Sequence, residues 1–212
     1  MPATAKICGL STAETLDAAV AGGASHVGLN FFPPSPRCVT FERAAALAAR
    51  APAAVVRVGV FVDPDDALLD RAISAGRLDA VQLHATPPER AAAVRARTRR
   101  EIWAVAAIKT REDLAAAFRY RGAADRILYD AKTPDGAALP GGMGVRFDWA
   151  LLDGFSHPLP WSLSGGLHPA NVGEAIGRTG ARLVDVSSGV ESAPGMKEPA
   201  LIATFLKAVA AA

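Results

Sequence analysis

Side chains that can transfer a proton or bind an anion recur along this sequence at the ends of short apolar runs. Thiols, carboxylic acids and imidazoles act as general acids and bases, and hydroxyl groups beside glycines bind anions. A chain that only had to fold would not need polar groups at so many equivalent positions. The side chains concerned are Cys8, Asn30, Asp63, Gln82, His84, Lys109, Asp130, Ser164, Asp185, Ser187 and Ser188.

Each of these residues also has a purely structural explanation. A free cysteine such as Cys8 is most often a small buried hydrophobic residue. Asp130 could cap the end of a strand, and His84 could satisfy a backbone carbonyl group. Asp63 stands before Pro64 and is better explained as a helix cap than as a catalytic acid. Their function therefore depends on which of them meet in space.

Two turns built from small residues give a more specific signal. Ser164-Gly165-Gly166-Leu167 and Ser187-Ser188-Gly189-Val190-Glu191 follow the last two apolar runs. Glycine lets the backbone approach a ligand, and exposed N–H groups, a serine hydroxyl and a helix N-terminus together bind a dianion. Tight turns alone could explain the glycines, but two such turns at neighbouring strand ends favour a phosphate site. The predicted phosphate-binding residues are Gly165, Gly166, Ser187, Ser188 and Gly189.

The elements that must position these residues alternate along the whole chain. Short apolar runs rich in β-branched residues are separated by Ala- and Leu-rich stretches with apolar spacing near 3.6 residues, which is typical of βαβ units. Strands are predicted over residues 5–9, 26–31, 55–62, 80–84, 102–108, 126–130, 161–164 and 183–187. Helices are predicted over residues 11–21, 41–51, 64–75, 88–99, 111–119, 148–153, 169–177 and 198–211.

Eight strands and eight helices within 212 residues favour an α/β protein with one (β/α)8 TIM barrel domain over residues 1–212. An open doubly wound sheet is the alternative, because periodicity does not count strands reliably. In a barrel the carboxyl ends of the strands form the catalytic face, so the polar residues above are expected to converge there. Two helix caps are predicted locally: Ser11 with Glu14 as a capping box, and Thr40 as a simple cap.

Composition excludes several classes of function. The formal net charge of +2 gives no strong basic field, so nucleic acid is not an expected partner. No apolar run of about 18 residues and no leader-like N-terminus occur, so we expect a cytoplasmic protein without a membrane span. Cys8 and Cys38 match neither a disulfide scaffold nor the spacing of a zinc site, so reduced thiols and no metal are expected.

A set of motifs, in order along the chain, resembles the phosphoribosylanthranilate isomerase family of tryptophan biosynthesis. The resemblance covers nearly the whole chain and implies an Amadori rearrangement, which converts N-(5-phosphoribosyl)anthranilate to 1-(2-carboxyphenylamino)-1-deoxyribulose 5-phosphate with no cofactor. The segments that carry it are Lys6-Ile7-Cys8-Gly9, Ser35-Pro36-Arg37, Val60-Phe61-Val62, Val81-Gln82-Leu83-His84, Asp130, Gly141-Gly142, Phe147-Asp148-Trp149, the two glycine turns with Asp185-Val186 before the second, and Pro194-Gly195-Met196-Lys197.

The resemblance also implies roles for individual residues. Cys8 would be the general base and Asp130 the general acid, on opposite sides of the sugar. Arg37 would recognise the anthranilate carboxylate, His84 and Asp185 would line the pocket, and the two turns would bind the 5-phosphate. Because a free thiol titrates at about 8.5 and a free aspartate at about 3.9, we expect a partly ionised Cys8 and a pKa of Asp130 raised by burial.

Three positions depart from the pattern of this family. Met143 stands where threonine is usual, Ala85 where glycine is usual, and Ser164 where alanine is common. Met143 bears only on how the loop after the sixth strand closes over the substrate, and not on the acid and base.

Other functions stay open on the sequence. One is a broader isomerase that also accepts the aminoaldose of the histidine pathway, although that related barrel has aspartate where Cys8 stands. Another is a barrel that binds a phosphosugar without turnover, which would need no acid and base. A thiol redox role for Cys8 with Cys38 has no support from their spacing. We expect the small-molecule substrate as the partner, and a monomer in preference to a homodimer.

Overall fold

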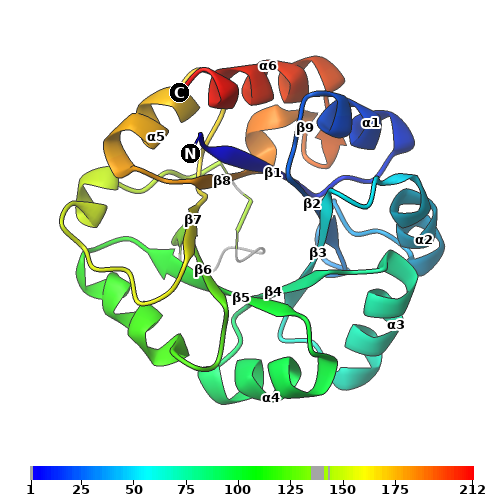
Figure 1. The fold of residues 1–212 in the computed structure, drawn as a ribbon, viewed down its shortest axis with the longest axis horizontal. Helices are drawn as coiled ribbons and strands as arrows, with labels where there is room; N and C mark the ends of the chain where they lie inside the picture. The colour runs from blue at the N-terminus through cyan, green and yellow to red at the C-terminus, as the bar shows by residue number, and fades with distance from the viewer. Residues whose placement is uncertain (1, 135–140, 143) are drawn as a thin grey trace.

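Eight parallel strands close into a barrel in which each strand pairs with the next along the chain and β8 pairs with β1. The computed structural model describes residues 2–134, 141–142 and 144–212. Figure 1 shows the strands as a ring with the helices outside it. The closed ring confirms the predicted (β/α)8 barrel and excludes the open sheet. The strands are β1 (Thr4–Cys8), β2 (His26–Asn30), β3 (Val56–Val62), β4 (Ala80–His84), β5 (Glu101–Ile108), β6 (Arg126–Ala131), β7 (Trp161–Leu163) and β8 (Leu183–Val186).

Six α-helices and three 3₁₀ segments connect the strands in the described residues. The helices predicted over residues 111–119 and 148–153 are 3₁₀ segments. The second is a single turn, since Gly154 follows it with φ 65° and Pro158 and Pro160 cannot continue a helix. The elements are α1 (Ala13–Ala21), α2 (Phe41–Arg50), α3 (Asp66–Gly76), α4 (Pro88–Thr98), η1 (Glu112–Tyr120), η2 (Trp149–Leu152), α5 (Val172–Thr179), η3 (Ser188–Val190) and α6 (Pro199–Ala210), with a hairpin of β9 (Glu191–Ala193) and β10 (Met196–Lys197) before α6.

Two predicted helix caps are wrong by one or two residues. The cap of α1 is Thr12, which accepts a hydrogen bond from the Thr15 amide, and not Ser11. The cap of α3 is Asp65, whose carboxylate accepts from Leu68. Asp63 cannot take this place because its φ of 41° is left-handed, whereas a cap residue needs an extended backbone. The predicted cap at Thr40 is confirmed.

The inside of the barrel changes from apolar to polar along the strands. A small apolar cluster of Val58, Ala80, Trp103 and Leu183 lies apart from the large core between strands and helices. Side chains two positions further along a strand face the same side. On β4 and β8 those positions hold Gln82 and Asp185, and the buried Lys6 and Ser162 belong to the same polar set. The barrel therefore presents buried polar groups toward the carboxyl ends of its strands.

In the part of the chain that the structure describes, no helix is both long enough and apolar enough to cross a membrane.

Candidate active site

A cavity at the carboxyl ends of the strands collects most of the predicted residues. It holds about 810 Å³ of empty space, part of it open solvent. Asp63, Lys109 and Gly189 are not on its wall. From the predicted set, its walls include Cys8, Arg37, His84, Asp130, Asp185, Gly165, Gly166, Ser187 and Ser188.

Asp130 lies on β6 with its carboxyl group buried beside Ser164 and Gly165, which follow β7. Its Oδ1 accepts a hydrogen bond of 2.9 Å from the Ala131 amide. Burial raises the pKa of Asp130 to about 7, and the negative charge of Asp185 adds to this rise, whereas the Ala131 amide, Ser164 and Lys6 oppose it. The predicted rise is confirmed. A carboxyl group of this kind is protonated in a large share of molecules near neutral pH.

Cys8 is the last residue of β1 and is also buried. Burial raises the pKa of the Cys8 thiol above its ordinary value; the charge of Lys6 opposes this rise and that of Asp185 adds to it. Desolvation exceeds the effect of the cation, so the thiol form predominates near neutral pH. The prediction that Cys8 is partly ionised is therefore wrong for this structure.

A fully buried lysine, Lys6, lies beside Cys8. Its Nζ donates to Asp185 Oδ1 at 2.9 Å, and the two residues are opposite each other where β1 pairs with β8. A methyl group on Gly28 would fall 2.9 Å from Cys8 Sγ and 3.2 Å from Lys6 Cε, so the thiol and the lysine share the space over this glycine. Burial alone would lower the pKa of Lys6, but Asp185 and the Cys8 thiolate outweigh it and raise the pKa to about 12.

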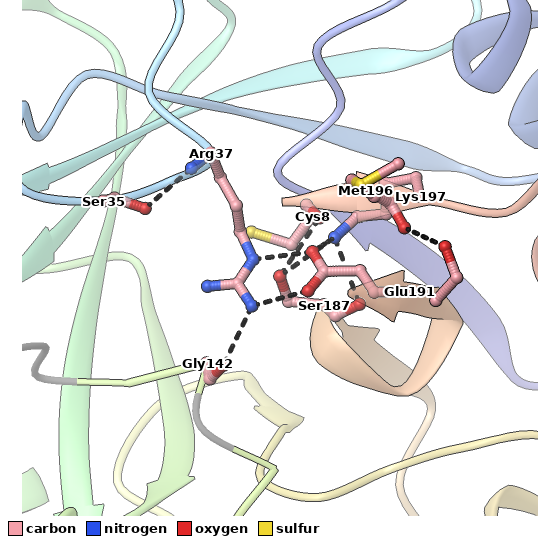
Figure 2. A network of polar contacts seen from close by, with 9 residues as sticks. Cys8, Ser35, Arg37, Gly142, Ser187, Glu191, Met196 and Lys197 are labelled. Carbon is pink, nitrogen blue, oxygen red and sulfur yellow. Dashed lines mark hydrogen bonds and ion pairs between the residues drawn. The ribbon is translucent and has the colours of Figure 1, made fainter. Parts of the chain in front are cut away.

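Arg37 is buried in an ion-pair network instead of being exposed (Figure 2). Its Nε and Nη2 donate to the two oxygens of Glu191 at 2.7 and 2.8 Å, and Nη2 also donates to the Gly142 carbonyl at 3.0 Å. Lys197 pairs with the same carboxylate and donates to the Ser187 carbonyl oxygen at 3.1 Å. Among the described residues, none accepts a hydrogen bond from the third guanidinium nitrogen, Nη1. Glu191 thus occupies one edge of the Arg37 guanidinium, and Nη1 lies close to Gly142 in the loop after β6.

The loop after β6 comes close to Asp130 and Arg37 through two glycines. A side chain at Gly141 would come within 2.8 Å of Asp130 Oδ2, and one at Gly142, whose φ is 71°, within 2.8 Å of Arg37 Nη1. Only glycine allows this backbone to lie so close to both groups. The predicted effect of Met143 on the same loop lies outside the described residues.

The two predicted phosphate turns lie side by side on the cavity wall. Gly165 and Gly166 have φ values of 89° and 62°, and the Ser187 hydroxyl donates to the Cys8 carbonyl at 3.3 Å. Gly189 differs from the other predicted residues of the turns, because a side chain there would overlap the Leu167 carbonyl oxygen at 1.9 Å. Gly189 thus allows the turns to pack together. Phosphate binding by these residues stays a prediction.

His84 lies on β4 with its ring beside Gln82. His84 Nε2 is 2.9 Å from Gln82 Nε2. Burial, aided by the charge of Lys6, lowers the pKa of His84 to about 4. The imidazole is therefore neutral at pH 7 and can donate and accept hydrogen bonds in the cavity.

Three charged residues of the site were not predicted from the sequence as site residues: Lys6, Glu191 and Lys197. Each occurs inside a motif that carries the family resemblance. A signal existed for Lys6, since a lysine within an apolar strand needs a buried partner. No comparable pattern predicted that Glu191 and Lys197 would meet Arg37, because these two lie on the β9–β10 hairpin and Arg37 lies in the loop after β2.

Comparisons with known proteins agree over nearly the full chain. The family model described as N-(5'phosphoribosyl)anthranilate (PRA) isomerase matches residues 5–208. The N-(5'-phosphoribosyl)anthranilate isomerase of Zymomonas mobilis subsp. pomaceae is 54% identical over 212 residues, which cover 99% of each chain. That of Paramagnetospirillum magneticum is 52% identical over 209 residues, covering 98% of this chain and 97% of the relative.

Solved structures show the same likeness. Phosphoribosyl anthranilate isomerase from Thermotoga maritima superposes with a TM-score of 0.85 at 35% identity, covering 99% of this chain and 100% of that chain. A structure of phosphoribosyl anthranilate isomerase in complex with reduced 1-(o-carboxyphenylamino)-1-deoxyribulose 5-phosphate superposes with a TM-score of 0.82 at 33% identity and the same coverage. On its sequence, its fold and its cavity, the chain belongs to the N-(5'-phosphoribosyl)anthranilate isomerase family.

Proposed function

We propose that this chain isomerises N-(5-phosphoribosyl)anthranilate to 1-(2-carboxyphenylamino)-1-deoxyribulose 5-phosphate in tryptophan biosynthesis, with Cys8 as general base and Asp130 as general acid. The observation that carries this proposal is the placement of these two groups on separate strands of one cavity, β1 and β6. A sugar bound between them meets a proton donor on one side and a proton acceptor on the other.

Asp130 acts first, as the acid. It protonates the ring oxygen of the ribose, the bond from that oxygen to C1 breaks, and the aminal opens to a Schiff base. A pKa of about 7 suits this step. An acid that titrates near the working pH is protonated in a large share of molecules and still gives up its proton readily.

Cys8 then acts as the base, in its thiolate form. It removes the proton from C2 of the Schiff base, which gives an enolamine. Tautomerisation adds a proton at C1 and leaves a carbonyl group at C2, so the carbon that was an aldehyde equivalent is reduced while its neighbour is oxidised. The reaction is an internal redox exchange and consumes no other reactant.

The remaining residues of the cavity bind the substrate in this proposal. Arg37 directs Nη1 to the anthranilate carboxylate, and a bidentate contact would require Nη2 to exchange the Gly142 carbonyl for the ligand. His84 and Asp185 face the sugar, and the turns at Gly165–Gly166 and Ser187–Ser188 take the 5-phosphate.

An assay with two substrates tests this function. The purified protein is given freshly generated phosphoribosylanthranilate, whose fluorescence is lost on conversion, and separately the aminoaldose of the histidine pathway. We expect turnover of the first and none of the second. Turnover of both would support a broader isomerase, and binding of phosphoribosylanthranilate without turnover would support a binding protein.

We also propose that the protein is a monomer. The large hydrophobic side chains that the described residues expose are Phe118, Val145 and Met196, which come from three separate segments. A stable protein interface needs a larger continuous apolar patch. A relative from Thermotoga maritima is described as dimeric, so the mass in solution should be measured by light scattering. We expect 21.9 kDa, and twice this mass would contradict the proposal.

A further inference from the structure

The proposed mechanism needs an unusual distribution of protons between Cys8 and Asp130. Asp130 titrates at about 7, and burial raises the pKa of Cys8 above its ordinary value. As the pH rises, Asp130 therefore loses its proton before Cys8 does. The mechanism requires the opposite arrangement, a thiolate with a neutral carboxylic acid. Only a minority of protein molecules has this arrangement of protons. That fraction grows as the pKa values of Cys8 and Asp130 approach each other.

The buried ion pair of Lys6 and Asp185 lies where it can favour this minority. Lys6 is on β1, two residues before Cys8, and the two side chains crowd the same space over Gly28. Asp185 is on β8 and lines the same cavity wall as Asp130. The 2.9 Å contact fixes the two charges relative to each other.

The net effect of the two charges on the pKa has opposite signs at Cys8 and at Asp130. At Cys8 the attraction of Lys6 exceeds the repulsion of Asp185. At Asp130 the repulsion of Asp185 exceeds the attraction of Lys6. Because the side chains of Lys6 and Cys8 also share the space over Gly28, the pair places its positive charge beside the thiol, and its negative charge acts more strongly on Asp130.

We propose that Lys6 and Asp185 are positioning residues whose buried ion pair favours a thiolate at Cys8 and a neutral acid at Asp130 at the same time. This inference rests on the proposed function, because only that function requires both forms together. A pair of reversed orientation would stabilise the unreactive arrangement, and a neutral pair would favour neither.

The other charges near the two groups act more weakly. Arg37 and Lys197 share the single carboxylate of Glu191, so that network keeps a net positive charge, and the effect of Lys197 on Cys8 is smaller than that of Lys6 or Asp185. His84 is uncharged at pH 7 because burial lowers its pKa to about 4. Lys6 and Asp185 are thus the charges whose removal should change the acid and the base most.

The test is a double variant, Lys6→Met with Asp185→Asn, in a Cys38→Ser background that leaves Cys8 as the only thiol. The double change removes both buried charges together, and replacement of a buried pair by neutral groups is often tolerated. Cys8 is titrated through the pH dependence of its alkylation by iodoacetamide, and Asp130 through the 13C shift of its carboxyl carbon, assigned with Asp130→Asn. The control is Asp17→Asn with Arg50→Met, which removes an exposed ion pair on the outer helices.

We expect the two titrations to move apart in the double variant, Cys8 upward and Asp130 downward, by about one pH unit each. The value of kcat/KM should then fall by about tenfold or more, because fewer molecules hold both groups in the reactive form, and the control should move neither titration. Unchanged titrations, or a shift of both in the same direction, would overturn the proposal. If the double variant does not fold, Asp185→Asn alone should lower both titrations and lower that of Asp130 more, and equal or absent shifts would overturn it.

These titrations need no substrate, so they separate this inference from the proposed function. A protein that shows the opposed shifts but does not convert phosphoribosylanthranilate has this effect of the ion pair and lacks the activity. A protein that converts the substrate and shows no shifts has the activity without this effect.

Discussion

Asp130 links the chemistry of the site to the stability of the fold. Its pKa is about 7 in the folded protein, against 3.8 for the exposed group. Between these values the folded state holds a proton that the unfolded state has lost. The stability that this proton provides is full below about pH 4 and is lost as the pH rises toward 7.

Replacing Asp130 by Asn should remove this pH dependence. The difference in unfolding free energy between Asp130→Asn and wild type should grow in favour of the variant between pH 4 and pH 8. The growth should be on the order of 2–4 kcal/mol, because the amide has no charge to bury. Urea denaturation at both pH values measures the difference. If the stability difference between variant and wild type is the same at pH 4 and pH 8, burial does not raise the pKa of Asp130.

Glu191 should act on binding through Arg37. Glu191→Gln removes the negative charge that holds the guanidinium and Lys197, so KM should rise by about tenfold or more with a smaller change in kcat. Asp17→Asn is the matched control, since it breaks an arginine pair that is exposed and should change KM less than about twofold. Equal KM values in the two variants would refute the role of Glu191.

At the scale of elements, the register between β1 and β2 determines where the base lies. Cys8 is paired with Gly28 across these strands, and a methyl group there would come within 2.9 Å of Cys8 Sγ. Gly28→Ala should therefore displace the thiol and lower kcat by about tenfold or more, since a shift of about 1 Å is costly in catalysis.

A second glycine gives the control for this change. Gly173 in α5 has no atom within 4 Å of an added methyl group, so Gly173→Ala should keep full activity and raise stability by about 0.5–1 kcal/mol, as helix propensity requires. Steady-state kinetics and thermal unfolding of both variants provide the comparison. If Gly28→Ala keeps wild-type kcat, the thiol does not need the space over this glycine.

Most of the elements could be predicted from the sequence because periodicity reports which face of a segment is buried. The strand ends were correct to within a residue, as the apolar run stops where the chain leaves the barrel. The caps at Ser11 and Asp63 were wrong because several polar residues precede each helix and only the backbone dihedral angles select among them. The 3₁₀ winding of η1 has no visible signal in its sequence.

At the scale of the whole molecule, closure of the barrel is what makes one site from distant residues. Cys8, Asp130 and Asp185 could be predicted to converge because the carboxyl ends of parallel strands share one face. The ionisation of Cys8 could not be predicted, since it depends on how far burial outweighs Lys6. The pairing of Arg37 with Glu191 depends on the loop after β2 and the β9–β10 hairpin, which meet only in the folded chain.

The most direct test of the whole account is a comparison of wild type, Cys8→Ser and Asp130→Asn in turnover of phosphoribosylanthranilate, with binding of the reduced product analogue measured in parallel. The account predicts that both variants lose about two or more orders of magnitude in kcat and still bind the analogue. Turnover within about threefold of wild type in either variant would contradict the assignment of that residue as base or acid.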